Sequence, residues 1–191
     1  MNIFVVDEDP HVSASQLCDK HVVKMILETA QLLCTAHRVL DGVEILQTSV
    51  SGKTLVKRWV LPDLGMDRKL LRNCHTNHPC SIWCRATSEN YMWLHRHGVG
   101  LLIEYSRRYN KMHVLQDMFH TLSSLPANMV QGGLSDFAQA MPDQYKSGIS
   151  AVTAYRRYYI FEKSRFAKWK NSAIPQWYVD GCNSNKIQMV K

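Results

Sequence analysis

Three observations predict a mainly α-helical protein that forms one compact domain. Of the 191 residues, 46 % are hydrophobic, enough for one sizeable core. Apolar residues recur at helical spacing in three principal stretches. No internal repeat or low-complexity tract interrupts the chain. We expect a single helical domain over residues 1–180, with a long irregular excursion, and a polar C-terminal tail over residues 181–191.

The first helix is expected over residues 13–40. Residues 1–6, MNIFVV, precede it as a short extended or buried segment. No Pro or Gly then interrupts a run rich in Leu, Val, Ala and Met. Ser13 or Ser15 can cap its start, and Gly42 follows its end. These features predict one uninterrupted helix.

The second helix is expected to begin near Pro79, which suits a first helical turn. Residues 43–70 come before it and contain the turn signals SGK and LPDLG, so we expect an irregular or weakly helical excursion there. Helical spacing then continues as far as Tyr105, and Gly98 and Gly100 predict a bend. The result is a long, bent helix.

The last principal helix is expected over residues 150–169. A shorter helix over residues 113–125 and a loop over residues 126–150 come before it. After Pro175 the chain becomes polar, and we expect it to be loose by Asn183.

Composition limits the class of protein. The formal net charge is +7, from 23 Lys and Arg against 16 acids, which favours partners that carry phosphate. No apolar stretch approaches the ~20 residues of a membrane span, and the N-terminus has acids where a secretory signal is basic. We expect a cytoplasmic protein with no membrane partner and assume a monomer. Six cysteines in apolar text predict reduced thiols.

No motif indicates a metal or a cofactor. The cluster Cys74, His75, His78, Cys80 and Cys84 lacks the paired CxxC spacing of structural zinc. The sequence contains no phosphate-binding loop, no dinucleotide fingerprint and no nucleophile elbow. We therefore expect neither a metal nor a cofactor.

The stretch CDKHVVKMILE places ionisable groups along one seam of the first helix. At about 100° per residue, one sector holds six polar residues, and almost everything outside it is apolar. The six are Lys20, His21, Lys24, Glu28, Gln31 and Thr35. One interpretation is an exposed ion pair between Lys24 and Glu28 on a buried helix. The other is a seam that lines a cleft, where a half-buried carboxylate between cations serves acid/base chemistry.

The segment YRRYYIFEKSRFAKWK interleaves six cations with six aromatic residues and a single acid, Glu162. The aromatic residues could be ordinary core contacts and the cations a solvated face. We favour nucleic-acid contact, because a polyanion neutralises clustered cations and aromatic rings stack on unpaired bases.

Three blocks, in order, resemble the pyrimidine-dimer DNA glycosylase family of T-even-type phages, also called endonuclease V. That family has an L-x-D-x-H pattern, and its catalytic Glu follows seven residues after the His. In this chain the stretch QLCDKHVVKMILE contains the pattern as Leu17, Asp19 and His21, and the glutamate as Glu28. The second block is the stretch from His78 through its aromatic residues to Leu102, Glu104 and Arg107. The third is the family's P-x-W-Y, present as PQWY at residues 175–178.

The resemblance implies an all-helical enzyme that binds duplex DNA, extrudes a nucleotide and attacks the sugar C1′ of the damaged base. In that family the α-amine left by Met removal forms an imine with the sugar, and the Glu handles protons and stabilises charge. By this resemblance, Glu28 has the role of the family's glutamate, and His21 takes the place of the residue beside that glutamate in the site. The DNA contacts that we expect are Lys20, His78, Arg85, Arg156, Arg157, Lys163, Arg165, Lys168, Lys170, Trp177 and Tyr178.

The N-terminus departs from the family. Asn2 replaces the family's Thr and is larger than the residues that usually permit removal of Met1, so we expect the terminal amine on Met1. Lys24 is an alternative nucleophile if burial lowers its pKa, or Glu28 activates water without an imine.

The predicted function is a phage-type DNA glycosylase or glycosylase/lyase on a flipped, damaged or modified pyrimidine, acting in DNA repair in the host cytoplasm. The alternatives are a transferase that modifies bases in phage DNA on the same scaffold, and a DNA-binding protein without catalysis.

Overall fold

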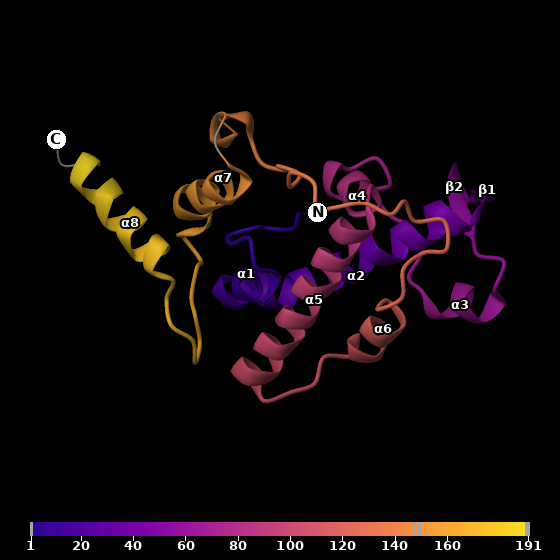
Figure 1. The fold of residues 1–191 in the computed structure, drawn as a ribbon, viewed down its shortest axis with the longest axis horizontal. Coiled ribbons are helices and arrows are strands. Elements are labelled where there is room, and N and C mark those ends of the chain that lie inside the picture. The colour runs from indigo at the N-terminus through magenta and orange to yellow at the C-terminus, as the bar shows by residue number, and fades with distance from the viewer. Residues whose placement is uncertain (1, 147, 149, 190–191) are drawn as a thin grey trace.

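The computed structural model describes residues 2–146, 148 and 150–189, and it confirms a mainly α-helical fold (Figure 1). The body consists of α1 (Pro10–Gln16), α2 (Asp19–Asp41) and α5 (Ser88–Tyr109), with α5 packed across the other two. The shorter helices are α3 (Leu64–Lys69), α4 (Pro79–Cys84), α6 (Gln116–Thr121), the 3-10 turn η1 (Asp143–Tyr145), α7 (Ala151–Tyr158), the π-helical η2 (Tyr159–Lys163) and α8 (Gln176–Met189). None of the helices in the described residues is long and apolar enough to span a membrane.

The core lies between α2, α5 and the N-terminal segment. Residues 3–6 form neither helix nor strand and are buried, which fits the buried alternative predicted for MNIFVV. They pack with the apolar sides of the two long helices, of which Met25, Ile26, Leu94 and Leu101 are fully buried. At 25–30 cal/mol per Å² of buried apolar surface, such side chains each stabilise the fold by about 2 kcal/mol. The start of the chain is therefore held inside the body.

The single helix predicted over residues 13–40 is wrong, because the chain is extended at Leu17 and Cys18. Asp9, not a serine, caps α1: its side chain accepts the N–H groups of residues 11 and 12. The break leaves backbone groups without helical partners. The Leu17 carbonyl accepts from Arg108, and the Cys18 N–H donates to the hydroxyl of Tyr159. Both partners are distant in sequence, so no local signal marks the break.

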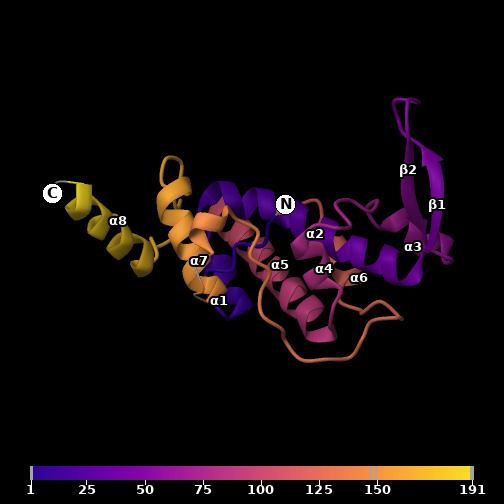
Figure 2. The same cartoon turned by 90° about the horizontal axis from the view of Figure 1, so that it is seen from above.

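The excursion over residues 43–70 is not irregular. It forms an antiparallel hairpin of β1 (Val43–Thr48) and β2 (Leu55–Val60), followed by α3. Figure 2 shows the hairpin projecting from the body at the end opposite α8. Arg38 of α2 anchors it, donating to carbonyls at Trp59, Leu70 and Leu71 and pairing with Asp67. Because both faces of the strands are largely exposed, their sequence lacks the clean alternation that predicts strands.

The long bent helix from Pro79 is also two helices. Thr87 caps α5 by accepting the N–H of Asn90, and α4 ends before it. No break occurs at Gly98 or Gly100, which lie inside the continuous α5. These glycines permit close packing: a Cβ at Gly98 would lie 2.2 Å from Phe119 of α6 and 2.8 Å from Thr29 of α2.

The C-terminal predictions were wrong in part. The helix predicted over residues 150–169 is present but ends at Lys163, as α7 followed by η2, and residues 167–169 form neither helix nor strand. The tail expected to be loose by Asn183 is helical as far as Met189, in α8, which extends away from the body (Figure 1). No apolar stripe runs along its sequence, so periodicity gave no helical signal there.

Replacement of Gly98 by Ala should destabilise the fold by about 1–3 kcal/mol, because the Phe119 ring and Thr29 must move to admit the methyl group. Urea denaturation measures the loss. Gly133→Ala is the matched control, since nothing lies within 4 Å of a Cβ at that position. Equal stability of the two variants would contradict the close-packing role of Gly98.

Candidate functional site

The polar seam of α2 opens into a pocket of about 460 Å³. Its walls come from the N-terminal segment, α2, the loop before η1, and the end of α7 with η2 and the turn that follows. The lining residues are Asn2, Phe4, Lys20, His21, Lys24, Glu28, Ala140, Tyr158, Lys163 and Phe166. Five of the predicted site residues on the first helix and at the N-terminus, namely Asn2, Lys20, His21, Lys24 and Glu28, therefore meet in one cavity, and Lys163 joins them from η2.

Two nitrogen atoms hold the carboxylate of Glu28. One oxygen, Oε1, lies 3.1 Å from Nζ of Lys24, and the other, Oε2, accepts the backbone N–H of Asn2 at 3.0 Å. The Glu28 side chain is 13 % exposed, whereas that of Lys24 is 66 % exposed. The carboxylate is thus oriented inside the pocket, with the start of the chain directly against it. Met1 lies outside the described residues.

The side chain of Asn2 fixes this arrangement. Its Oδ1 accepts the N–H groups of Ile3 and Phe4, and its Nδ2 donates to the carbonyl of Ala140 at 2.6 Å. Phe4 has a φ of +56°, which is strained for an aromatic residue. Its ring stacks on His21, with 4.1 Å between ring centroids. Strained backbone next to an ordered carboxylate is typical of a functional site.

His21 is buried and neutral. Its Nδ1 lies 2.6 Å from the Tyr159 hydroxyl, which also accepts the N–H of Cys18. The hydroxyl proton is therefore free to point at Nδ1, and a neutral His21 then carries its own proton on Nε2. Burial, followed by the positive charges of Lys163 and Lys24, lowers the pKa of His21 to about 3. His21 positions its neighbours and does not act as a cationic acid near pH 7.

Cations and aromatic rings surround the carboxylate. Lys20 Nζ lies 5.0 Å from the centroid of the Phe166 ring. Lys163 Nζ lies 4.2 Å from that of the Tyr158 ring and donates to its hydroxyl at 2.9 Å. Rings that can contact a planar base and ammonium groups that can contact phosphate thus border an acid/base group.

The exposed surface of α2 is wider than the polar seam that the sequence indicated. Val23 and Leu27, which the sequence places outside the polar sector, are 41 % and 44 % exposed, so the surface beside Lys24 is partly apolar. Thr35 at the far end is buried, and its hydroxyl accepts the N–H of Cys74. The polar seam that faces the pocket therefore ends near Glu28.

The remaining predicted DNA contacts do not line this pocket. Two arginines serve the fold: Arg85 donates to the Thr76 carbonyl and Ser81, and Arg156 to the Val6 carbonyl and Asp7. Others remain on the surface. Arg157, Arg165, Lys168 and Lys170 are exposed, Trp177 and Tyr178 are half-buried, and His78 is half-buried and caps α4.

Sequence reasoning did not assign five contributors to the site. Phe4, Ala140 and Tyr159 carried no signal, because the first two lie in segments without periodicity and the third reads as one more core aromatic. Tyr158 and Phe166 were noted only as members of the basic aromatic segment. The interleaving of cations and aromatic residues was the one usable signal, and it brought Lys163 into the site.

Within the described residues, no group of three or more His, Cys, Asp or Glu side chains is arranged to hold a metal ion. All six cysteines are free thiols, and burial raises the pKa of Cys34 and Cys80 to about 12.

The low pKa of His21 predicts acid sensitivity. As pH falls, the unfolded chain binds this proton near pH 6.5 and the folded chain only near 3, so the stability present above pH 6.5 is lost towards pH 3 at about 1.4 kcal/mol per pH unit. Between pH 7 and 5, urea denaturation should show His21→Gln losing about 2 kcal/mol less stability than the wild type. Equal losses, or a charged His21 imidazole at pH 5 by NMR, would contradict this account.

Comparison with models of known protein families gives a match. A sequence model of the family described as pyrimidine dimer DNA glycosylase matches residues 1–117, which include the N-terminal segment, α2 and α5 but neither α7 nor the PQWY stretch. No curated protein and no solved structure shows a significant match. The match confirms the resemblance seen in the sequence and supports a DNA glycosylase-type function with DNA as the substrate. Since it covers more than half of the chain, the protein belongs to the pyrimidine dimer DNA glycosylase family.

Proposed function

We propose that this protein is a DNA glycosylase or glycosylase/lyase that acts on a damaged or modified pyrimidine extruded from duplex DNA, with Glu28 as the central acid/base group. The observation that carries the proposal is the 3.0 Å contact between the backbone nitrogen of Asn2 and Glu28 Oε2. It puts the start of the chain and a half-buried carboxylate in one pocket. A cavity of about 460 Å³ is within the range of small-molecule sites.

The nucleophile in this proposal is the α-amine at the start of the chain. We expect it on Met1, because Asn2 is large for removal of that residue, and on Asn2 in a chain from which Met1 has been removed. The backbone nitrogen of Asn2 marks its place in the pocket. The resemblance to the family implies an amine at this place, and the nitrogen already lies beside the carboxylate. Asn2 is well anchored through Ala140, so its nitrogen is positioned before substrate arrives.

The reaction follows from this pair. The amine forms a bond to C1′ as the bond between C1′ and the base nitrogen breaks, and the base leaves with that electron pair and takes up a proton. Glu28 accepts a proton from the bonded amine. The nitrogen lone pair then forms the C=N bond as the bond between C1′ and the ring oxygen O4′ breaks, and O4′ takes up a proton, which gives the imine with the ring-opened sugar. Water then hydrolyses the imine to an abasic site, or elimination cleaves the strand. Glu28 also stabilises positive charge at the sugar as the base departs.

Lys24 is a weaker candidate for the nucleophile. That alternative requires an amine buried in the protein, and the Lys24 side chain is two-thirds exposed. In our proposal Lys24 orients Glu28, while Lys20 and Lys163 contact the phosphates that flank the extruded nucleotide. His21 and Phe4 form the wall behind it. The enzyme would act as a monomer, in repair of DNA in the cytoplasm of a phage-infected cell.

Glu28→Gln should lower base release from dimer-containing duplex DNA by about 10²–10⁴-fold, because the amide still accepts the Asn2 N–H but transfers no proton. DNA affinity should remain within a few-fold of wild type. Glu89→Gln, on the exposed side of α5, is the matched control. Unchanged turnover in Glu28→Gln would refute the assignment. Mass spectrometry of the product distinguishes an abasic site from the heavier nucleotide that a transferase would leave.

Borohydride reduction during turnover should trap a covalent adduct between the protein and DNA, because reduction converts an imine into a stable amine. Peptide mapping should place the adduct on the α-amine of the first residue, and an intact-mass measurement identifies that residue as Asn2 or Met1. Lys24→Gln should still give the adduct. An adduct on Lys24, or release of the base without any adduct, would contradict the proposed nucleophile.

A further inference from the structure

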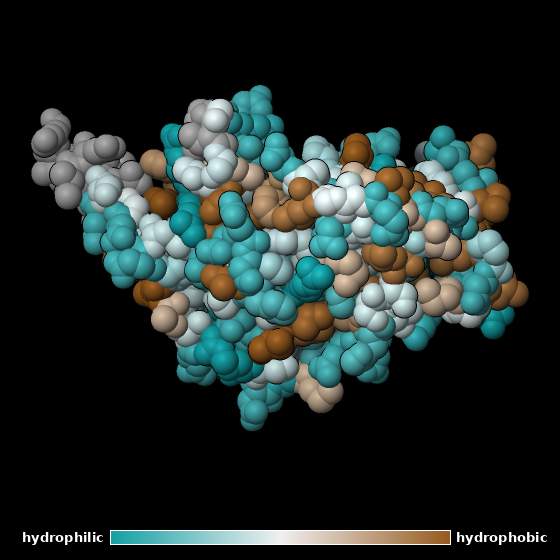
Figure 3. Space-filling view, viewed as in Figure 1, coloured by the Kyte–Doolittle hydropathy of each residue, from teal (hydrophilic) through white to brown (hydrophobic). Residues whose placement is uncertain are grey.

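The β1–β2 hairpin and α3 form a second charged surface, distant from α7 and α8 along the molecule (Figures 1 and 2). A two-stranded hairpin is marginally stable on its own, and this one leaves both faces largely exposed. Hydrophobic patches lie at this end of the molecule (Figure 3). The hairpin itself exposes apolar side chains: Val43 is 63 %, Leu46 65 % and Leu55 66 % exposed. Because such a hairpin gains little stability from burial, we expect its surface to have a functional role.

The two faces of the hairpin differ in charge. Ile45 pairs with Arg58, so both side chains lie on one face. That face and α3 border a cavity of about 400 Å³ that also includes Arg68 and Arg72. On the opposite face, Lys57 is held by Glu44 at 2.8 Å. One face therefore presents arginines to a cavity and the other a closed ion pair.

Acids do not compensate these arginines. The segment 43–72 contains six cations and three acids, and each acid is already engaged. Glu44 binds Lys57, Asp67 binds the buried Arg38, and Asp63 caps α3.

Among the described residues, no carboxylate forms an ion pair with Arg58, Arg68 or Arg72. Within the described residues, Arg58 donates to one acceptor, the carbonyl of Asn73, at 3.3 Å. The cavity is also lined by Arg38 and Asp67, which pair with each other. The three other guanidinium groups therefore have no carboxylate partner there and repel one another unless an anion joins them. Guanidinium matches the oxygen atoms of phosphate in a bidentate manner.

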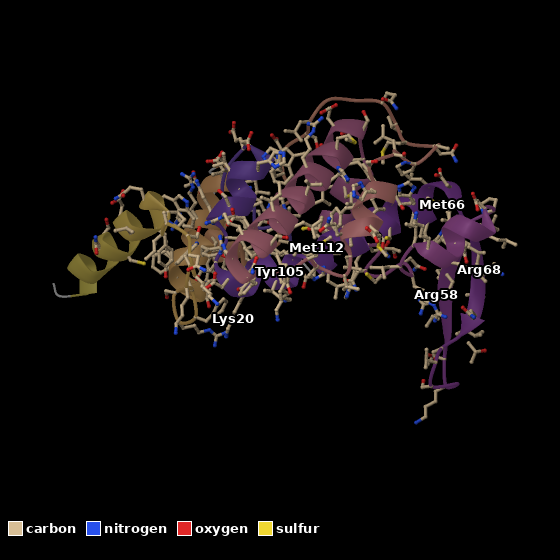
Figure 4. All side chains as sticks on the ribbon, turned by 90° about the horizontal axis from the view of Figure 1, so that it is seen from below. Lys20, Arg58, Met66, Arg68, Tyr105 and Met112 are labelled. Carbon is tan, nitrogen blue, oxygen red and sulfur yellow. The ribbon has the colours of Figure 1, made fainter. Side chains whose placement is uncertain are left out.

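This surface and the pocket of Glu28 are connected through α2: Arg38 near the end of that helix holds the hairpin, and Glu28 lines the pocket. Cys74 lies between this surface and the pocket: burial raises the pKa of its thiol, the charge of Glu28 raises it further, and the charge of Arg58 opposes this. The backbone of Cys74 is joined to α2 through Thr35. Figure 4 shows the hairpin with Arg58 projecting on the same side of the molecule as Lys20, with the body between them. A single duplex lying along this side would meet both groups of cations.

We propose that Arg58, Arg68 and Arg72 form an accessory binding site for the backbone phosphates of duplex DNA. The inference rests on the proposed function, because the duplex that delivers a nucleotide to the Glu28 pocket is the one that reaches the hairpin. Contacts of this kind are independent of sequence and set the register of the protein on DNA. The hairpin then fixes how the duplex lies across α2.

The test is the salt dependence of binding to a long undamaged duplex, measured by fluorescence anisotropy. For duplex DNA the slope of log K against log salt changes by about 0.9 for each phosphate contact. Arg68→Gln/Arg72→Gln, at two exposed positions, should therefore make the slope shallower by about 2, and adding Arg58→Gln by up to about 3. The control is Lys57→Gln/Arg96→Gln, which removes two cations that already face Glu44 and Glu89. Thermal melting verifies that each variant folds.

A shallower slope in the arginine variants and not in the control supports the accessory site. An unchanged slope, an equal change in the control, or no binding of duplex DNA by the wild type overturns it. The use of undamaged DNA separates this binding measurement from catalysis, because such DNA contains no damaged base for the enzyme to release. If base release and adduct formation fail while the slope still changes, the proposed function falls and the phosphate site stands; the reverse pattern overturns only the phosphate site.

Discussion

The fully buried guanidinium of Arg108 is the interaction on which the arrangement of the site depends. Near the end of α5 it pairs with Glu104 and Asp19 and donates to the carbonyls of Ser15 and Leu17. The first carbonyl belongs to the last turn of α1 and the second to the break between α1 and α2. Asp19, at the first turn of α2, also accepts the backbone N–H of Lys170. One side chain thus joins α5, the start of α2 and the returning C-terminal segment.

Arg108 matters more for the geometry of the site than for the net stability of the fold. A buried ion pair often contributes little net stability, but removing one partner costs several kcal/mol because a charge is left unpaired in the interior. The bonds of Arg108 therefore determine where α2 begins, and hence the direction in which His21 and Glu28 point. A helix running unbroken from α1 would rotate that seam away from Tyr159.

The seam of α2 was the most predictable part of the molecule. Helical periodicity alone placed His21, Lys24 and Glu28 on one side of one helix, and they line one pocket. Asn2 and Phe4 could not be predicted in this way, because their positions depend on contacts with Ala140 and His21 that lie far away in sequence. The same reason explains the undetected break at Leu17. The hairpin was missed for a different reason: strands exposed on both faces need no alternation of apolar and polar residues.

Pairing of acids within the fold accounts for the positive charge on the surface on either side of the pocket. The acids near the site are engaged within the fold: Asp19 and Glu104 with Arg108, Asp67 with Arg38, and Glu28 with Lys24 and the Asn2 amide. Internal pairing of acids leaves much of the net charge of +7 on the surface, as lysines and arginines on either side of the pocket. A polyanion would then be attracted to both sides, while the single carboxylate inside the pocket repels phosphate and favours a developing positive charge. In this arrangement the cations on the protein surface orient the phosphate backbone of the DNA, and the sugar of the reacting nucleotide lies against Glu28.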